Sequence, residues 1–227
     1  MKNPAFKGFT PQTFQFFHDL KNNNNKEWFD AHKHIYEAEL LNPLKGLFQA
    51  LYPIMYTIDA EFDMRPHRAI SRIYRDTRFS NNKDPYKVFM WMTFQQPVSR
   101  EEWKDLPGYF LEVNENTYTL GLGLFQPKKK VMDNLRDAII YEPEEFQRVT
   151  QETVLDRGYT VNGEEYKRPI ANDLPEYFQQ WFQRKGIWVE KVKPIGEELY
   201  SGSFVDLILE DFKAFEWLYN FMKEATD

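Results

Sequence analysis

Residues 108–124 read GYFLEVNENTYTLGLGL, and the pattern within them is that of paired strands. Aromatic and branched side chains fill both ends of this stretch, and Asn114-Glu115-Asn116 separates them, which predicts a β-hairpin over 108–113 and 117–124. In the second arm, apolar side chains at Tyr118, Leu120, Leu122 and Leu124 alternate with Thr117, Thr119, Gly121 and Gly123. One face is therefore apolar, and the glycines on the other face permit close approach of another backbone or a ligand.

The segments around this hairpin predict an α+β fold. The first sixty residues have helical spacing, with Thr10-Pro11 opening the first helix and Pro43 expected to kink or split the second. Strands are expected at 69–75, 88–94 and 187–192, and helices are expected after Pro127, Pro143, Pro175 and Ser203. We also expect a short helical turn at Asp84-Pro85 and a second hairpin turn at Asn162-Gly163.

Because regular βαβ alternation is absent, we expect a mixed or largely antiparallel sheet. This sheet would be packed by an N-terminal helical segment and a C-terminal helix. We expect one compact domain over 1–227, with a helical part at 1–60, a sheet-containing part at 65–195 and the last helix at 203–224.

Composition excludes several classes of protein. The 227 residues contain no cysteine, which excludes disulfides, thiolate nucleophiles, cysteine-ligated zinc and iron–sulfur clusters. No apolar run approaches the roughly 18 residues of a membrane span, and the first thirty residues show no apolar leader. We therefore expect a cytoplasmic protein without a membrane partner. The net charge of −6 argues against general nucleic-acid binding.

One stretch departs from the acidic average. Between Arg65 and Lys87 there are seven basic and two acidic residues, a net charge of +5 that leaves −11 for the rest of the chain. We call residues 65–87 the basic island. Guanidinium groups suit carboxylates and phosphates, and a helix start at Asp84-Pro85 would add free backbone N–H groups. The predicted anion-binding residues are Arg68, Arg72, Arg75, Arg78, Lys83, Tyr86 and Lys87.

The placement of these side chains follows from the expected strand. On such a strand Arg68, Arg72 and Tyr74 share one face, and Arg75 lies on the other. Lys83 and Lys87 would add charge, and Tyr86 would orient or stack on the ligand. The alternative is that the basic residues pair with the acidic remainder of the fold or face water.

Other motifs give no catalytic or cofactor site. The chain lacks the glycine-rich nucleotide fingerprints and the nucleophile elbow, so no cofactor is expected and no nucleophile is assigned. Asp30 and His34 have a helical metal-pair spacing, but we interpret them as part of a solvated helix face and predict no metal site. The 39 aromatic residues are spread along the chain and are expected to build the core.

Several motifs resemble a known family. They are FKGFTP at 6–11, NNNKEWFD at 23–30, ISRIYRDTRFS at 70–80, PYK at 85–87, GYFLEV at 108–113, LGLGLFQP at 120–127 and KRP at 167–169. Together they are similar to the uncharacterised family known as domain of unknown function 2461. The resemblance implies a compact single domain and suggests that the basic island is a family feature, but it implies no activity, cofactor or substrate.

Three functions remain open at this point. The first is binding of a small ligand that carries a phosphate or carboxylate, with metal-free transfer or hydrolysis as the possible reaction if the protein is an enzyme. The second is a protein-interaction or assembly module that uses exposed aromatic residues and the acidic surface. The third is local nucleic-acid binding, which we rank last because the −11 outside the basic island would repel a long polyanion.

Overall fold

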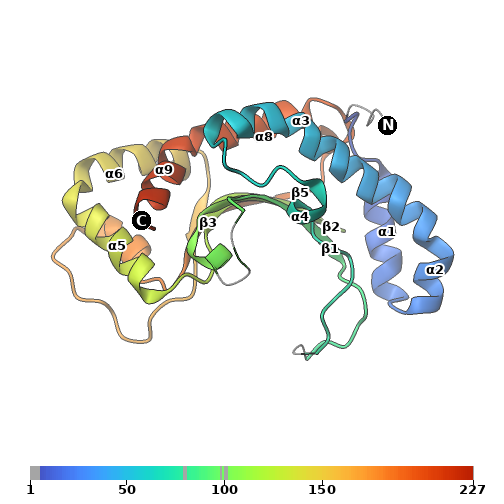
Figure 1. The fold of residues 1–227 in the computed structure, drawn as a ribbon, viewed down its shortest axis with the longest axis horizontal. Helices are drawn as coiled ribbons and strands as arrows, with labels where there is room; N and C mark the ends of the chain where they lie inside the picture. The colour runs from blue at the N-terminus through green and yellow to red at the C-terminus, as the bar shows by residue number, and fades with distance from the viewer. Residues whose placement is uncertain (1–5, 79–80, 98, 100–101, 227) are drawn as a thin grey trace. The chain divides into compact units, whose positions relative to one another are not determined.

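The computed structural model describes residues 6–78, 81–97, 99 and 102–226 (Figure 1). The described chain divides into two compact units. Unit 1 comprises Met1–Thr93, Leu111–Thr119 and Val192–Glu210, and unit 2 comprises Phe94–Phe110, Leu120–Lys191 and Asp211–Asp227, each without its undescribed residues. The expected single domain over 1–227, with its three parts, stays a prediction.

The N-terminal part of unit 1 is helical, as predicted. It contains α1 (Pro11–Asn22), α2 (Lys26–Ile35), the π-helix η1 (Tyr36–Leu41) and α3 (Asn42–Ile58). Pro11 lies in the first turn of α1, and the Asn25 side chain caps α2 by accepting from the Trp28 N–H. The helical stretch changes next to Pro43, since the π-helix η1 separates α2 from α3 and Pro43 lies in the first turn of α3. Proline has no N–H to donate to the Glu39 carbonyl four residues earlier, and this carbonyl accepts from the Thr13 hydroxyl at 2.6 Å.

The sheet matches the expected antiparallel type. Its five strands are β1 (Phe89–Phe94), β2 (Gly108–Asn114), β3 (Thr117–Leu124), β4 (Thr160–Asn162) and β5 (Ile187–Pro194), in the order β1-β2-β3-β5-β4. β2 and β3 form the predicted hairpin, and β4 pairs antiparallel with β5, with Val161 opposite Val189. The fold is therefore α+β.

The glycines of β3 permit the close approach of another backbone. A Cβ at Gly121 would overlap the carbonyl oxygen of Val189, and one at Gly123 would overlap the carbonyl oxygen of Ile187. Both partners belong to β5, so the two glycines allow that strand to lie against β3.

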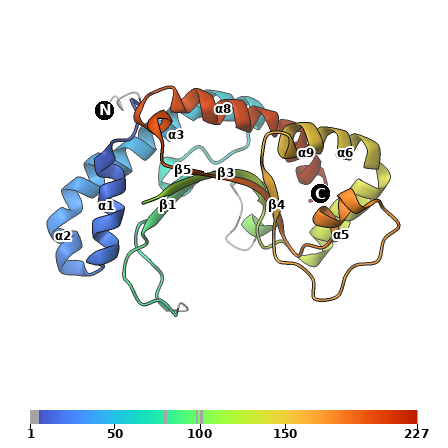
Figure 2. The ribbon, with the colours of Figure 1, turned by 180° about the vertical axis from the view of Figure 1, so that it is seen from behind.

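The helices of unit 2 follow the predicted order, with altered lengths (Figures 1 and 2). They are α5 (Lys129–Tyr141), α6 (Pro143–Thr150), the π-helix η3 (Gln151–Leu155), the 3₁₀-helices η2 (Glu102–Asp105) and η4 (Glu176–Phe178), α7 (Gln179–Phe182) and α9 (Glu216–Glu224). The expected last helix is two helices, α8 (Phe204–Ala214) and α9, because the chain breaks at Phe215.

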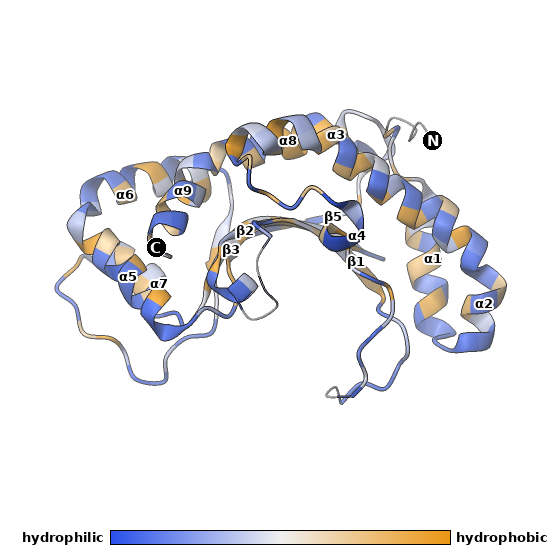
Figure 3. Cartoon of the chain, viewed as in Figure 1, coloured by the Kyte–Doolittle hydropathy of each residue, from blue (hydrophilic) through white to orange (hydrophobic). Residues whose placement is uncertain are grey.

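The two remaining helices lie in unit 1. They are α4 (Pro66–Ala69) and the 3₁₀-helix η5 (Glu197–Tyr200). Figure 3 shows hydrophilic and hydrophobic residues on the same helices, as expected for amphipathic helices that bury one face. Each helix that the structure describes is too short or too polar to cross a membrane.

Three local predictions are wrong. The expected strand 69–75 instead begins with α4 and continues as an irregular segment with bridges only at Ile70 and Tyr74, because Pro66 starts a helical turn. Asp84-Pro85 forms no helical turn, because the next residue pairs as an isolated bridge. Asn162-Gly163 is not a hairpin turn, since the partner of β4 is the distant strand β5.

Aromatic side chains build the interior, as expected. The largest fully buried side chains are Trp181, Tyr109, Tyr118, Tyr219, Phe17, Phe29, Phe48, Phe94, Phe146, Phe178, Phe182 and Phe204. In unit 1 Phe29 lies in a group of rings with Tyr36 and Tyr86. This group borders the basic island and positions part of it.

Candidate functional site

Two segments of the basic island pair side by side in unit 1. The Arg75 N–H donates to the carbonyl of Pro85 at 2.9 Å, and the Lys87 N–H donates to the carbonyl of Ile73 at 2.8 Å. These bonds flank an antiparallel bridge between Tyr74 and Tyr86. Since side chains alternate along paired strands, the tyrosines lie on one face, and Arg75 and Lys87 lie on the other.

The tyrosine face is fixed by the helices. The Tyr86 ring is buried and stacks on Phe29 of α2 with 4.2 Å between ring centroids. The Asn24 side chain accepts from the Tyr86 N–H at 3.1 Å and donates to the Tyr86 carbonyl at 3.0 Å. Burial and the nearby Asp30 carboxylate raise the pKa of Tyr86. Tyr86 therefore holds the backbone beside Lys87 in place, whereas sequence reasoning assigned it to the ligand.

Arg75 and Lys87 lie on the opposite face, and the charge of a third cation, Arg72, also acts on Lys87. Lys87 is only 9% exposed, and its Nζ lies 3.9 Å from the centroid of the Trp91 ring. Burial, together with the charges of Arg72 and Arg75, lowers the pKa of Lys87 to about 8, and the charge of Glu112 acts in the opposite direction. A charged side chain is therefore disfavoured at this position.

The hydrogen bonding of this cluster is incomplete. The Arg75 Nη2 donates weakly to the Tyr86 carbonyl at 3.4 Å, while the Arg75 Nε is buried and has no hydrogen-bond partner among the described residues. Among the described residues, no carboxylate forms an ion pair with Arg72, Arg75 or Lys87. Buried donors are normally satisfied, so this cluster lacks acceptors.

The other predicted site residues have partners of their own. Arg68 forms an ion pair with Asp63 at 3.7 Å, and Arg78 forms a bidentate pair with Asp76, with its Nη2 at 2.7 Å from the carboxylate. The Lys83 Nζ donates to the Thr77 carbonyl at 2.9 Å. The basic island thus separates into locally paired residues and the three-cation cluster.

Sequence reasoning missed three participants. Asn24 lies in an asparagine run that we interpreted only as a helix break, although its side chain binds the Tyr86 backbone. Trp91 and Glu112 lie on β1 and β2, outside the basic island. A local signal for Trp91 is the alternation in FMWMTF, which exposes every second residue of β1.

The predicted helix-face residues form no metal site in the described part of the chain. Among the residues that the structure describes, no three or more histidine, aspartate or glutamate side chains lie together so that they could hold a metal ion. Asp30 lies near Tyr86, and His34 is exposed on α2. This pair therefore gives no basis for assigning a metal.

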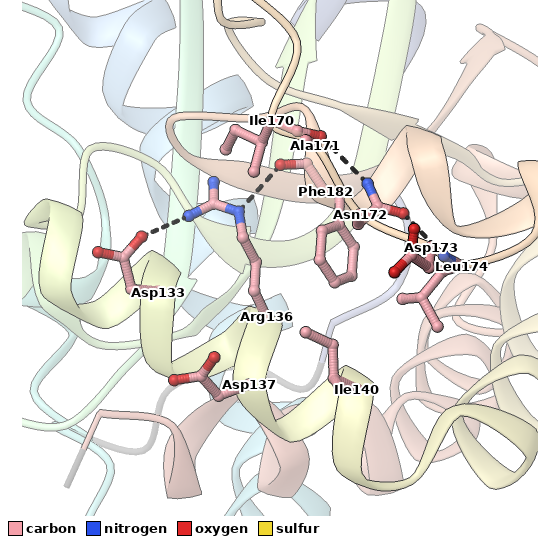
Figure 4. Close-up of a pocket in the computed structure, with 10 residues that line it drawn as sticks. All are labelled: Asp133, Arg136, Asp137, Ile140, Ile170, Ala171, Asn172, Asp173, Leu174 and Phe182. Atoms are coloured by element: carbon pink, nitrogen blue, oxygen red, sulfur yellow. Dashed lines mark hydrogen bonds and ion pairs between the residues drawn. The ribbon is translucent and has the colours of Figure 1, made fainter.

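Unit 2 contains a separate cavity of about 480 Å³ (Figure 4). It lies between α5 and the segment 170–174, and Arg136 is one of the residues that line it. The Arg136 guanidinium is buried and donates to Asp133 at 2.9 Å and to the carbonyls of Phe182 at 3.0 Å and Arg184 at 2.6 Å. These partners use three of its five N–H donors, and Arg136 thereby ties α5 to the 182–184 segment.

Comparison with known proteins identifies a family but no function. Residues 12–221 match the family described as "Conserved hypothetical protein (DUF2461)". No curated protein matches the chain. Because the matched region covers most of the 227 residues, the chain belongs to the family of conserved hypothetical proteins known as domain of unknown function 2461.

Proposed function

We propose that unit 1 binds a small ligand bearing a carboxylate or phosphate group at Arg72, Arg75 and Lys87. The observation that carries this proposal is the buried Arg75 Nε, which has no hydrogen-bond partner among the described residues. A buried donor without an acceptor costs about 1–3 kcal/mol, and more when the group is charged. Because this atom is sealed from solvent, an anion would remove that cost by drawing the half-buried Arg75 side chain toward it.

Electrostatics support the same ligand chemistry. Arg72 and Arg75 both act on Lys87, and Glu112 is the carboxylate that acts on it from β2. An anion between the three cations would offset their mutual repulsion and favour the charged form of Lys87. A guanidinium presents parallel N–H groups to a carboxylate or phosphate, which favours these groups over a spherical anion such as chloride.

The surroundings favour a small ligand over a polymer. Lys87 lies beside the rings of Phe89 and Trp91, which form apolar walls next to its amine. The chain outside the basic island carries −11, which would repel a long polyanion. We therefore propose a metabolite-sized anion and place nucleic acid last.

Calorimetric titration with inorganic phosphate, succinate, citrate and adenosine monophosphate tests this proposal. At least one should bind, and Arg72→Gln and Arg75→Gln should each weaken binding by about tenfold or more, the loss of one charged hydrogen bond. Arg78→Gln is the matched control, because Arg78 is paired with Asp76 and its loss should leave affinity unchanged. Absence of binding, or an equal loss in all three variants, would overturn the proposal.

A second candidate function is a protein-interaction module, favoured by the outer face of α5. Two cavities, of about 480 and 490 Å³, lie against this helix, and Asp137 lines both. Beside them, the exposed fractions of Ile140 and Tyr141 are 52% and 84%. Carboxylates from Asp173 and Glu142 also line these cavities. Apolar side chains ringed by carboxylates suit a basic amphipathic peptide.

Fluorescence anisotropy with a labelled amphipathic peptide of lysine and leucine tests this second function. Asp137→Lys should weaken binding by about tenfold, since it replaces an attractive charge with a repulsive one. Glu152→Lys makes the same charge change on the exposed face of η3, away from both cavities, and should leave binding unchanged. Equal effects of the two variants would reduce the interaction to nonspecific charge attraction.

A further inference from the structure

We infer that Lys87 acts as a nucleophilic amine, which condenses with the carbonyl group of an anionic carbonyl compound, such as a 2-oxo acid, held by Arg72 and Arg75. The inference rests on the proposed anion site and names the chemical class of its ligand. It goes beyond binding, because it assigns a covalent step to one residue of the cluster.

The position of Lys87 differs from that of an ordinary surface lysine. Its side chain is buried to 9% exposure, its backbone N–H is bonded to the Ile73 carbonyl, and its amine lies beside Trp91. No described residue accepts a hydrogen bond from its Nζ or forms an ion pair with it. Lys83, in contrast, is exposed and donates to the Thr77 carbonyl.

The Lys87 amine is not completely sealed from solvent. The Arg75 Nε is sealed from solvent and has no hydrogen-bond partner among the described residues. The Lys87 Nζ does not belong to this group of sealed atoms. Trp91, whose exposed fraction is 36%, forms one wall beside the amine. The inference requires a small carbonyl compound to reach Nζ beside this ring while its carboxylate faces the guanidinium groups.

Desolvation and neighbouring cations are known ways to activate a lysine amine. Here both act, and the pKa of Lys87 falls to about 8 against the opposing charge of Glu112. At about pH 7.5 this leaves roughly a quarter of the amine neutral, against about one part in a thousand for a lysine with a pKa of 10.5. Lys87 would then supply about 200-fold more nucleophile than a surface lysine at that pH.

The step balances without an oxidant, a reductant or a metal. The lone pair of the neutral Nζ forms a bond to the carbonyl carbon, and the carbonyl π electrons move to oxygen, which takes up a proton. The nitrogen releases one proton to give the neutral carbinolamine. The carbinolamine loses its hydroxyl group as water, using a second proton, and the C=N nitrogen then releases its remaining proton. The overall reaction joins an amine and a carbonyl compound to give an imine and one water molecule.

The test is reductive trapping with glyoxylate and cyanoborohydride at about pH 7.5, followed by peptide mass spectrometry of the full chain. In the wild-type protein, Lys87 should be modified at least tens of times faster than Lys83, which serves as the internal control. Succinate, which carries carboxylate groups but no aldehyde or ketone carbonyl, should slow the modification by competition. Lys87→Arg should remove the modified peptide while keeping the positive charge.

The outcomes separate the covalent inference from the proposed binding function. Binding of succinate without preferential labelling of Lys87 would overturn the inference and leave the anion site intact. Fast labelling that succinate does not slow would confirm a reactive amine but contradict the anion site on which its ligand class depends. Labelling of Lys87 at the rate of Lys83 would overturn the inference. Both rates are measured in the wild-type protein, so this outcome does not depend on whether a variant folds.

Discussion

Replacing Lys87 by methionine should stabilise the folded protein at neutral pH. Methionine keeps the length and apolar character of the side chain but removes the amine that the cluster disfavours. The pKa of Lys87 falls from 10.5 to about 8 on folding, chiefly through burial and then through Arg72 and Arg75. Since each tenfold change in an ionisation constant is worth about 1.36 kcal/mol, protonated Lys87 costs the folded state about 3 kcal/mol.

The pH dependence of this cost follows from proton binding. Below about pH 8 the amine is protonated in both states, so the cost is fully present and constant. Between about pH 8 and 10.5 the unfolded chain binds more protons, so stability rises with pH. Above that range the cost is gone. Methionine also loses the cation–π contact with Trp91, worth about 1 kcal/mol, which leaves a net gain of about 2 kcal/mol at about pH 7.

Urea unfolding followed by tryptophan fluorescence measures this difference. The gain in unfolding free energy for Lys87→Met should be about 2 kcal/mol at about pH 7 and about 1 kcal/mol at about pH 9.5, where the folded amine is neutral but most of the unfolded chains still bind the proton. Lys83→Met is the control and should change stability by no more than about 0.5 kcal/mol at either pH, because Lys83 is exposed. A destabilised Lys87→Met, or a gain that is the same at both pH values, would refute the reasoning.

Three further variants test the framework around the site, each by urea unfolding. Asn24→Ala removes two hydrogen bonds to the Tyr86 backbone, so it should lower the unfolding free energy by about 1–3 kcal/mol and weaken anion binding. Unchanged stability and unchanged anion binding would show that these two hydrogen bonds do not position the site. Gly123→Ala should cost about 1–3 kcal/mol or more, because its Cβ would overlap β5, whereas Gly108→Ala, with 3.4 Å to its nearest neighbour, should cost less. Arg136→Met should cost about 3–5 kcal/mol by leaving buried carbonyls unpaired, yet anion binding should persist if that residue is structural.

The fold elements that sequence predicts correctly carry strong local signals. The hairpin of β2 and β3 has strand-forming residues on both sides of an asparagine-rich turn, with clear alternation in β3. α1 and α5 have helical spacing, with Pro11 in the first turn of α1 and Pro127 just before α5. The wrong predictions are short segments whose conformation depends on distant partners. Residues 70–75 lie beside 85–92 without forming a continuous ladder, and β4 pairs with β5 instead of a neighbouring strand.

The positive charge of the candidate site could be predicted from the sequence, but the residues that form the site could not. Net charge marks the whole basic island, whereas pairing decides which cations remain available for a ligand. Part of that pairing is local: in Asp63–Arg65 and Asp76–Arg78 the carboxylate accepts from both the backbone N–H and the guanidinium two residues later. This Asp-x-Arg pattern could have removed Arg78 from the prediction.

The burial of Lys87 has no comparable local signal. It arises because β1 places Trp91 beside the amine and because the segment around Tyr86 is held by Asn24, which is distant in sequence. Such contacts depend on the tertiary arrangement of unit 1. Sequence reasoning therefore found the cationic region, while the structure selected the residues that form the cluster.

The most direct measurement is an NMR titration of Lys87 in protein carrying ¹³C-labelled lysine, with the signal assigned by Lys87→Arg. Without ligand, the pKa of Lys87 should be about 8, as burial and the two arginines require. With saturating phosphate, the pKa should rise toward its ordinary value near 10.5, because the bound anion favours the charged amine. A pKa near 10.5 in both conditions, or a pKa near 8 that phosphate does not change, would contradict an anion site at Arg72, Arg75 and Lys87.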